Sequence, residues 1–180
     1  MSEPYDVLVV CEGNLCRSPL AERLLQSRLA DTGVRVSSAG VGAVVGAPMD
    51  ASAAAELTRL GGDPSDFVAR QLTASMANDA DLVLTATRAI RSQVVAVAPT
   101  ALKRTFALRE LAALLEDPPW GEGGGDVKEM LARAADWRGS VSGLGADLDV
   151  PDPIGRSADV HRSTADLVDR ATRVIAAWLA

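Results

Sequence analysis

Residues 6–25, DVLVVCEGNLCRSPLAERLL, combine the pattern of a buried strand, a short polar loop and the start of a helix. The nearly continuous apolar run from Asp6 to Cys11 is typical of a parallel strand that is covered on both faces. Ser18 and Pro19 suit a helix N-cap and first turn, and Leu20, Leu24 and Leu25 then share one helical face. This order of elements indicates an α/β unit.

The rest of the chain continues the alternation of strands and helices. We therefore predict one α/β domain over residues 1–180, in three layers: a four-stranded parallel sheet with helices on both faces. A segment at about 117–149 holds seven of the fifteen glycines and reads as an insertion with mobile loops around one helix. The further expected strands are 34–38, 81–85 and 103–108, and the further helices are 51–60 (capped by Asp50), 90–98, 109–116, 126–138 and one from about 160 to 178.

Composition excludes several classes of protein. The formal net charge is −6, which argues against nucleic acid and anionic membranes as partners. We find no apolar run long enough to span a membrane and no signal peptide at the N-terminus, so we expect a cytoplasmic protein. Two cysteines, Cys11 and Cys16, cannot form a disulfide framework, and with the single His161 they fall short of a structural zinc site.

The loop after the first strand carries the chemistry. Backbone N–H groups between a strand and a helix N-terminus form an anion-binding nest, and Gly13 and Asn14 tolerate the positive φ that a tight cradle needs. Arg17 adds a planar fork for two phosphate oxygens, and the same field stabilises a thiolate at Cys11. The segment lacks the Lys and Ser/Thr of a nucleotide-binding loop. Cys16 is expected to be a buried structural cysteine, and His161 a surface residue early in the last helix.

The pattern Cys11-Glu12-Gly13-Asn14-Leu15-Cys16-Arg17-Ser18 resembles the signature of the low-molecular-weight protein tyrosine phosphatases. The residues 37–40, 69–72, 81–84 and 152–153 are similar to later motifs of that family, in order. The resemblance implies a nucleophile at Cys11, oxyanion binding by Arg17 and a general acid at Asp152. It implies phosphate binding by the loop residues Glu12, Gly13, Asn14, Leu15, Cys16, Arg17 and Ser18, with Asn14, Ser18 and Ser38 supporting the loop. No metal or cofactor is implied, and we expect a monomer acting on a phosphorylated protein.

The rim of the site departs from the tyrosine-specific members. Their aromatic wall positions correspond here to Ile154 and to Val44 or Val45, and Glu12 adds a carboxylate that we expect at the rim as a charge filter. The stretch 38–46 resembles bacterial members paired with exopolysaccharide tyrosine kinases, so such a kinase is a candidate partner. The segment 152–155 resembles the protein-arginine phosphatase branch, which is the alternative function. Two further alternatives are less favoured: a non-catalytic phosphate-binding module, and arsenate reductase, whose thioredoxin-coupled kind relays oxidation to two downstream cysteines that this chain lacks.

Overall fold

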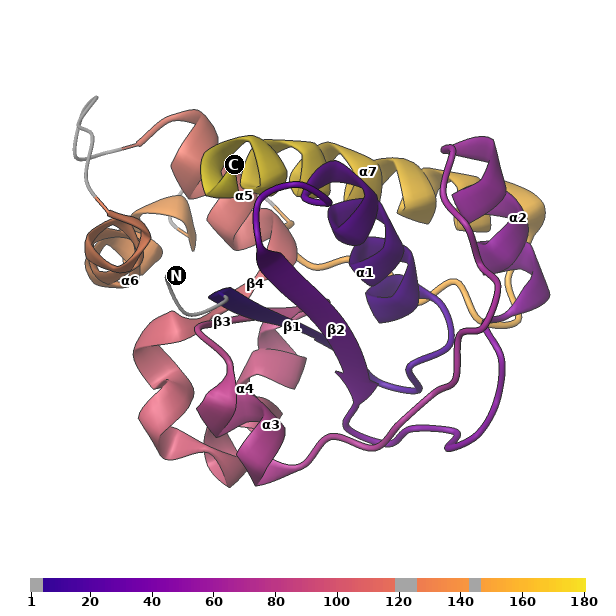
Figure 1. Ribbon diagram of the computed structural model, residues 1–180, viewed down its shortest axis with the longest axis horizontal. Helices are drawn as coiled ribbons and strands as arrows, with labels where there is room; N and C mark the ends of the chain where they lie inside the picture. Colours follow the sequence, from indigo (N-terminus) through magenta and orange to yellow (C-terminus); the bar gives the residue numbers. More distant parts are fainter. Residues whose placement is uncertain (1–4, 119–125, 143–146) are drawn as a thin grey trace.

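A parallel sheet of four strands, in the order β2-β1-β3-β4, organises the molecule (Figure 1). The computed structural model describes residues 5–118, 126–142 and 147–180. Cys11 pairs with Gly40 at the carboxyl end of the sheet, and Val10 pairs with Thr85. The predicted sheet is confirmed. Its strands are β1 (Tyr5–Cys11), β2 (Val34–Gly40), β3 (Leu82–Thr85) and β4 (Thr105–Ala107).

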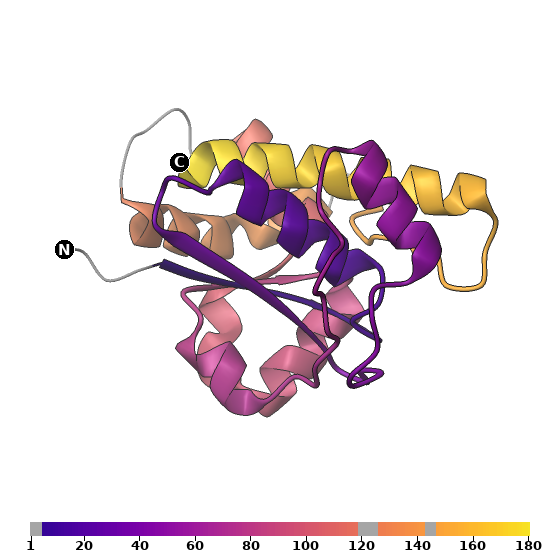
Figure 2. The same ribbon diagram turned by 45° about the vertical axis from the view of Figure 1, so that its right-hand side comes forward.

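Helices cover both faces of this sheet, as predicted (Figures 1 and 2). One face is covered by α1 (Arg17–Arg28), α2 (Ala51–Arg59), α5 (Leu108–Glu116) and α7 (Ala158–Leu179). The other is covered by α3 (Ala74–Asp79), α4 (Arg88–Val97) and the 3₁₀ helix η1 (Pro99–Arg104). The helix α6 (Val127–Ser142) contacts both α5 and η1.

Burial explains the sequence patterns. Val7 to Val10 of β1 are at most 2 % exposed, because helices lie on both sides of that strand. The long helix α7 packs against α1 and α5 and buries Val168, Ala171 and Ile175, which lie at three- and four-residue spacing. The strand β1 therefore lies in a well-packed core beneath these helices.

Several predicted boundaries shift. Ser18 is not the N-cap of α1: the helix begins at Arg17 with Cys16 as its cap, because the Ser18 hydroxyl is engaged inside the loop. Only Thr105–Ala107 of the predicted fourth strand is extended, since Pro99 starts a 3₁₀ turn that continues to Arg104. The six-residue helix α3 was not predicted.

Other local predictions hold. Asp50 caps α2, and its carboxylate accepts hydrogen bonds from the N–H groups of Ser52 (3.0 Å) and Ala53 (3.1 Å). The helix predicted within the glycine-rich segment is α6. The loops predicted around it lie largely outside the described residues. No helix in the described part of the chain is long and apolar enough to cross a membrane.

Candidate active site

The loop from Cys11 to Ser18 lies at the carboxyl edge of the sheet, where parallel α/β folds bind their ligands. It joins the end of β1 directly to the first turn of α1. Cys11, Asn14, Cys16, Arg17 and Ser18 are all buried, with Cys11 at 2 % exposed. The loop is therefore part of the core of the domain.

The carbonyl groups of this loop face outward. The oxygens of Cys11, Glu12 and Gly13 accept hydrogen bonds from the N–H groups of residues 41, 42 and 44, and the oxygen of Leu15 accepts one from residue 50. In a trans peptide the carbonyl and the following N–H point in opposite directions. The N–H groups of residues 12, 13, 14 and 16 therefore point to the concave side, which is the anion-binding nest expected from the sequence.

Asn14 is the centre of the hydrogen bonds that hold the loop. Its backbone has φ 54°, the left-handed conformation predicted for this position, whereas Gly13 does not adopt a positive φ. The Asn14 amide donates to Ser18 Oγ (2.8 Å) and to Ser38 Oγ (2.9 Å). Its oxygen accepts the N–H of Arg70 (2.9 Å). The expected support by Asn14, Ser18 and Ser38 is thus a set of direct contacts.

Three supporting residues were not singled out from the sequence. Glu22, whose pKa is raised by burial, accepts a hydrogen bond from Ser38 Oγ. Arg70 Nε donates to the carbonyl of Ser38 (2.6 Å). A Cβ on Gly40 would lie 2.5 Å from the carbonyl oxygen of Glu12 and 2.9 Å from the N of Asn14, so this position has no room for a side chain.

Cys11 and Ser18 are in direct contact, with Sγ and Oγ separated by 2.9 Å. The Ser18 oxygen already accepts a hydrogen from Asn14. Its own hydrogen can be donated to the sulfur, which is nearer than its other acceptor, the carbonyl of Ala39 at 3.4 Å. A hydrogen bond to the thiolate favours the charged form, which is the reactive form of a cysteine.

The Arg17 guanidinium joins the loop to a distant segment of the chain. Nη1 donates to the carbonyl of Val150 (3.1 Å), and Nη2 forms an ion pair with Asp152 Oδ2 (2.8 Å). The arginine side chain is 7 % exposed and the Asp152 side chain 47 %. Asp152 Oδ1 also accepts the N–H of Ile154 (3.2 Å). Asp152 thus reaches the phosphate loop across 135 positions of sequence.

A cavity of about 240 Å³ lies over the sulfur of Cys11. Val44 and Ile154 form aliphatic walls, and the exposed Glu12 lies at its edge. Of the two valines expected near the rim, Val44 lines the cavity, whereas Val45 is exposed and does not line it. The described lining residues include no aromatic side chain. They are Cys11, Glu12, Gly13, Leu15, Cys16, Arg17, Gly42, Val44, Asp152 and Ile154.

Cys16 is buried, as predicted, and burial together with the nearby Asp50 raises the pKa of its thiol. His161 is not a surface residue: it is 5 % exposed, and its Nδ1 lies 3.9 Å from Asp50 Oδ1. The apolar face of α7 gave no sign of this, because burial of position 161 depends on the N-terminus of α2 packing against it.

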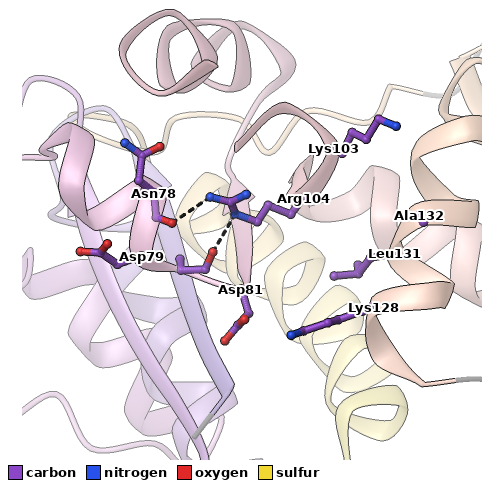
Figure 3. Close-up of a pocket in the computed structure, with 9 residues that line it drawn as sticks. Asn78, Asp79, Asp81, Lys103, Arg104, Lys128, Leu131 and Ala132 are labelled. Atoms are coloured by element: carbon purple, nitrogen blue, oxygen red, sulfur yellow. Dashed lines mark hydrogen bonds between the residues drawn. The ribbon is translucent and has the colours of Figure 1, made fainter. Parts of the chain in front are cut away.

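A second, larger cavity of about 390 Å³ lies near the amino end of β3 (Figure 3). Its arginine, Arg104, donates to the carbonyls of Ala80 and Asn78 (both 2.8 Å). None of the described lining residues is a cysteine, serine or histidine. The described part of this lining thus provides no cysteine or serine as a nucleophile, unlike that of the Cys11 cavity.

Comparison with known proteins agrees with this geometry. The family model for low molecular weight phosphotyrosine protein phosphatases matches residues 6–119. The probable low molecular weight protein-tyrosine-phosphatase EpsP of Ralstonia solanacearum is 38 % identical over 143 residues, covering 77 % of this chain and 97 % of that protein. The chain belongs to the low-molecular-weight protein-tyrosine-phosphatase family, and it is an enzyme of that phosphatase class.

Solved structures extend the similarity over nearly the whole chain. The tyrosine phosphatase Wzb from Escherichia coli K30, in complex with sulphate, has a TM-score of 0.72 at 26 % identity, covering 97 % of this chain and 98 % of that one. The YwlE arginine phosphatase from Geobacillus stearothermophilus has a TM-score of 0.74 at 27 % identity, with 98 % and 93 % covered. These matches extend beyond the family model, which ends before Asp152.

Proposed function

We propose that this chain hydrolyses phosphomonoesters through a cysteinyl-phosphate at Cys11, without a metal ion, and that its substrates are phosphotyrosine proteins. One observation carries the assignment. Cys11, the inward N–H groups, Arg17 and Asp152 meet at one cavity, and the last two are 2.8 Å apart. A nucleophile, an oxyanion cradle and a proton donor are the three parts that such a transfer needs.

In the first step the Cys11 thiolate attacks phosphorus. The bond between phosphorus and the leaving oxygen breaks, and a protonated Asp152 donates its proton to that oxygen. The inward N–H groups and Arg17 bind the equatorial phosphate oxygens, on which negative charge gathers in the transition state. The half-exposed position of Asp152 suits this role, because the carboxyl faces both the cavity and the solvent.

In the second step water replaces the sulfur. Asp152, now a carboxylate, takes a proton from the water molecule, whose oxygen attacks phosphorus. The phosphorus–sulfur bond breaks, and inorganic phosphate and the Cys11 thiolate are released. Ser18 supports both steps by donating a hydrogen bond to the sulfur, which makes the thiolate a better leaving group.

Hydrolysis of p-nitrophenyl phosphate in excess chelator tests the proposal. We expect full turnover in chelator, and Cys11→Ser is expected to lose more than about 10⁴-fold in kcat, the order seen when a nucleophile is removed. The variant is expected to keep phosphate binding, measured by calorimetry, since the cradle is made of backbone groups and Arg17. Turnover that needs an added metal, or an active Cys11→Ser, would contradict the mechanism. Phosphate binding by the parent protein without any turnover would favour the non-catalytic module instead.

The physiological partner that we propose is a phosphorylated tyrosine kinase of the cytoplasm. Two observations support it: the sequence 38–46 resembles the bacterial members paired with such kinases, and both cysteines are free, as a reducing compartment requires. Dephosphorylation of an autophosphorylated kinase domain, followed by mass spectrometry at its tyrosines, tests this partner.

The second candidate is a protein-arginine phosphatase. The aliphatic walls at Val44 and Ile154 favour it, because they provide no aromatic face for a tyrosine ring. Comparing kcat/KM for a phosphotyrosine peptide with that for a phosphoarginine peptide of the same sequence separates the two. We expect the phosphotyrosine peptide to be the better substrate. A higher kcat/KM for phosphoarginine would assign the chain to the other branch.

A further inference from the structure

Three metal-binding side chains meet beneath the phosphate loop. The Cys16 thiol, the Asp50 carboxylate and the His161 imidazole each offer one ligand atom, and these atoms all lie within 4.8 Å of one another. Cys16 and His161 are buried, at 3 % and 5 % exposed. The proposed phosphatase mechanism uses none of these three side chains.

The cluster lies where three helices begin. Cys16 is the N-cap of α1, Asp50 is the N-cap of α2, and His161 is in the first turn of α7. These helices pack on one another on the same face of the sheet (Figures 1 and 2). The backbone is held as well, because Asp50 N–H donates to the carbonyl of Leu15 (2.9 Å). Three separate segments therefore present their ligand atoms from fixed positions.

The spacing between His161 and Asp50 leaves these two side chains close but not hydrogen-bonded to each other. His161 Nδ1 and Asp50 Oδ1 are 3.9 Å apart, which is too long for a hydrogen bond. Nitrogen, oxygen and sulfur ligands of one tetrahedral zinc ion lie roughly 3.3–3.6 Å from each other, as follows from metal–ligand bonds of about 2.0–2.3 Å. The Asp50 cap uses Oδ1, so Oδ2 is left for a ligand. Because the ligand atoms lie within 4.8 Å of one another, the side chains would draw closer together on binding the ion.

We propose that Cys16, Asp50 and His161 form a binding site for a single zinc ion. The Cys16 S–H bond breaks, the proton passes to solvent, and a zinc–sulfur bond forms. One thiolate and one carboxylate then balance the two positive charges, with a neutral imidazole as third ligand. Thiolate and imidazole select zinc over magnesium and calcium, which prefer oxygen. Three protein ligands leave one position to water, and Cys16 also lines the Cys11 cavity, which provides a path from solvent.

This site goes beyond the proposed function and is independent of it. It does connect two parts of the active site, because Cys16 belongs to the phosphate loop and His161 lies in the helix that follows the Asp152 segment. A bound ion would tie these two segments together. A structural zinc site usually has four protein ligands, whereas this cluster supplies three and leaves the fourth position to water.

Cobalt(II) binding in the Cys11→Ser background tests the proposal. This background removes the only other thiol, so any thiolate-to-cobalt charge-transfer band must come from Cys16. We expect one cobalt per chain with that band, and its loss when zinc is added in competition. Because the background has no nucleophile, the result does not depend on whether the phosphatase mechanism is correct.

Three further variants identify the ligands. Cys16→Ser is expected to lose the charge-transfer band. Asp50→Asn keeps an N-cap residue of equal quality for α2 while removing the charge, and His161→Phe keeps a buried ring. Each is expected to weaken cobalt affinity at least about tenfold. Loss of a residue that only supports a metal ligand already costs about that much, and loss of a ligand should cost more. Thermal unfolding of the metal-free variants verifies that they are folded. No charge-transfer band in the Cys11→Ser protein, or unchanged affinity in folded His161→Phe, would overturn the site.

Discussion

The phosphate loop, residues 11–18, and the acid segment, residues 149–155, face the same cavity but are built in opposite ways. Five residues of the first, Cys11, Asn14, Cys16, Arg17 and Ser18, are buried, and its carbonyls and side chains are held by many hydrogen bonds. The second is largely exposed, with Asp152 and Ile154 each nearly half exposed. It is held by the Arg17 ion pair, by Val150 N–H donating to the carbonyl of Ala86 (2.8 Å), and by contacts of Asp149 with Arg88 and Arg109.

The difference follows from what each loop has to do in the proposed mechanism. Oxyanion stabilisation depends on donors that do not reorganise during the reaction, and burial in the core provides this rigidity. Asp152 recovers its proton in each cycle from the water molecule that attacks the cysteinyl-phosphate, so its carboxyl has to remain accessible to water. Changes in the phosphate loop are therefore expected to affect folding and catalysis together, and changes in the acid segment to affect catalysis alone.

The strongest test of this contrast is Asp152→Asn. We expect kcat to fall by about 10²–10⁴-fold for phenyl phosphate, the range for loss of a general acid, and by much less for p-nitrophenyl phosphate, whose leaving group needs little protonation. The midpoint of thermal unfolding is expected to stay nearly constant, because the side chain is half exposed. Equal losses on the two esters would remove Asp152 from the acid role.

Gly40→Ala tests the opposite end of the comparison. The added Cβ would meet the backbone of Glu12 at 2.5 Å and that of Asn14 at 2.9 Å, so both stability and kcat are expected to fall. We expect about 1–3 kcal/mol of destabilisation, the range for overpacking, measured by urea unfolding.

The matched control is Gly13→Ala, in the same loop. A Cβ there meets only Leu15, at 3.7 Å, and φ is not positive. It is expected to change the free energy of unfolding by less than about 0.5 kcal/mol. If the two variants had the same free energy of unfolding, the close contact between Gly40 of β2 and the phosphate loop would not be needed to hold that loop.

Glu22→Gln shows how far the support of the phosphate loop depends on charge. Burial raises the pKa of Glu22, although Ser38, Arg23, Arg70 and Gln26 oppose the shift. A raised pKa in the folded state means that the protonated carboxyl is favoured on folding. Its stabilising contribution is present below the unfolded value of about 4.3 and is lost as the pH rises through the folded value. We therefore expect the melting temperature of the parent, relative to the glutamine variant, to decrease from acidic to neutral pH; an increase would contradict this sign.

The smallest effect is expected for Glu12→Gln at the cavity edge. Glu12 lines the cavity, and its charge acts on a phosphate bound there with only partial screening at physiological salt, where the Debye length is about 8 Å. We expect the variant to gain a few-fold in kcat/KM on acidic phosphotyrosine peptides and to lose as much on basic ones, with both changes shrinking in high salt. Asp31→Asn, an exposed charge in the turn before β2, is the control. If the ratio of kcat/KM on acidic peptides to kcat/KM on basic peptides were the same in both variants, Glu12 would have no role in selectivity.

Local sequence was sufficient for the parts of the site that are contiguous. The strand, the loop and Arg17 follow one another within residues 6–18, and their order alone predicts the nest. The aspartate cap at Asp50 was predictable for the same reason. Asp152 was found only through its Asp-Pro motif and the family resemblance, since nothing near it in the sequence points to Arg17.

Contacts between distant segments account for what was missed. Gly40 is required only because β2 pairs with β1 in a register that places it beside Glu12 and Asn14. The role of Arg70 depends on its backbone and side chain reaching Asn14 and Ser38 from another loop. His161 was misplaced because a periodic pattern gives the face of an element but does not identify what packs against that face.

The register of Cys11 opposite Gly40 also links catalysis to the energetics of the whole fold. The cradle exists only while β1 and β2 are paired, so an unfolded chain has no cradle. Any oxyanion that binds the cradle therefore shifts the unfolding equilibrium by mass action. An occupant at one hundred times its dissociation constant adds about 2.7 kcal/mol to the stability of the protein. By this linkage, the phosphate that the proposed reaction releases would protect the folded enzyme that produced it.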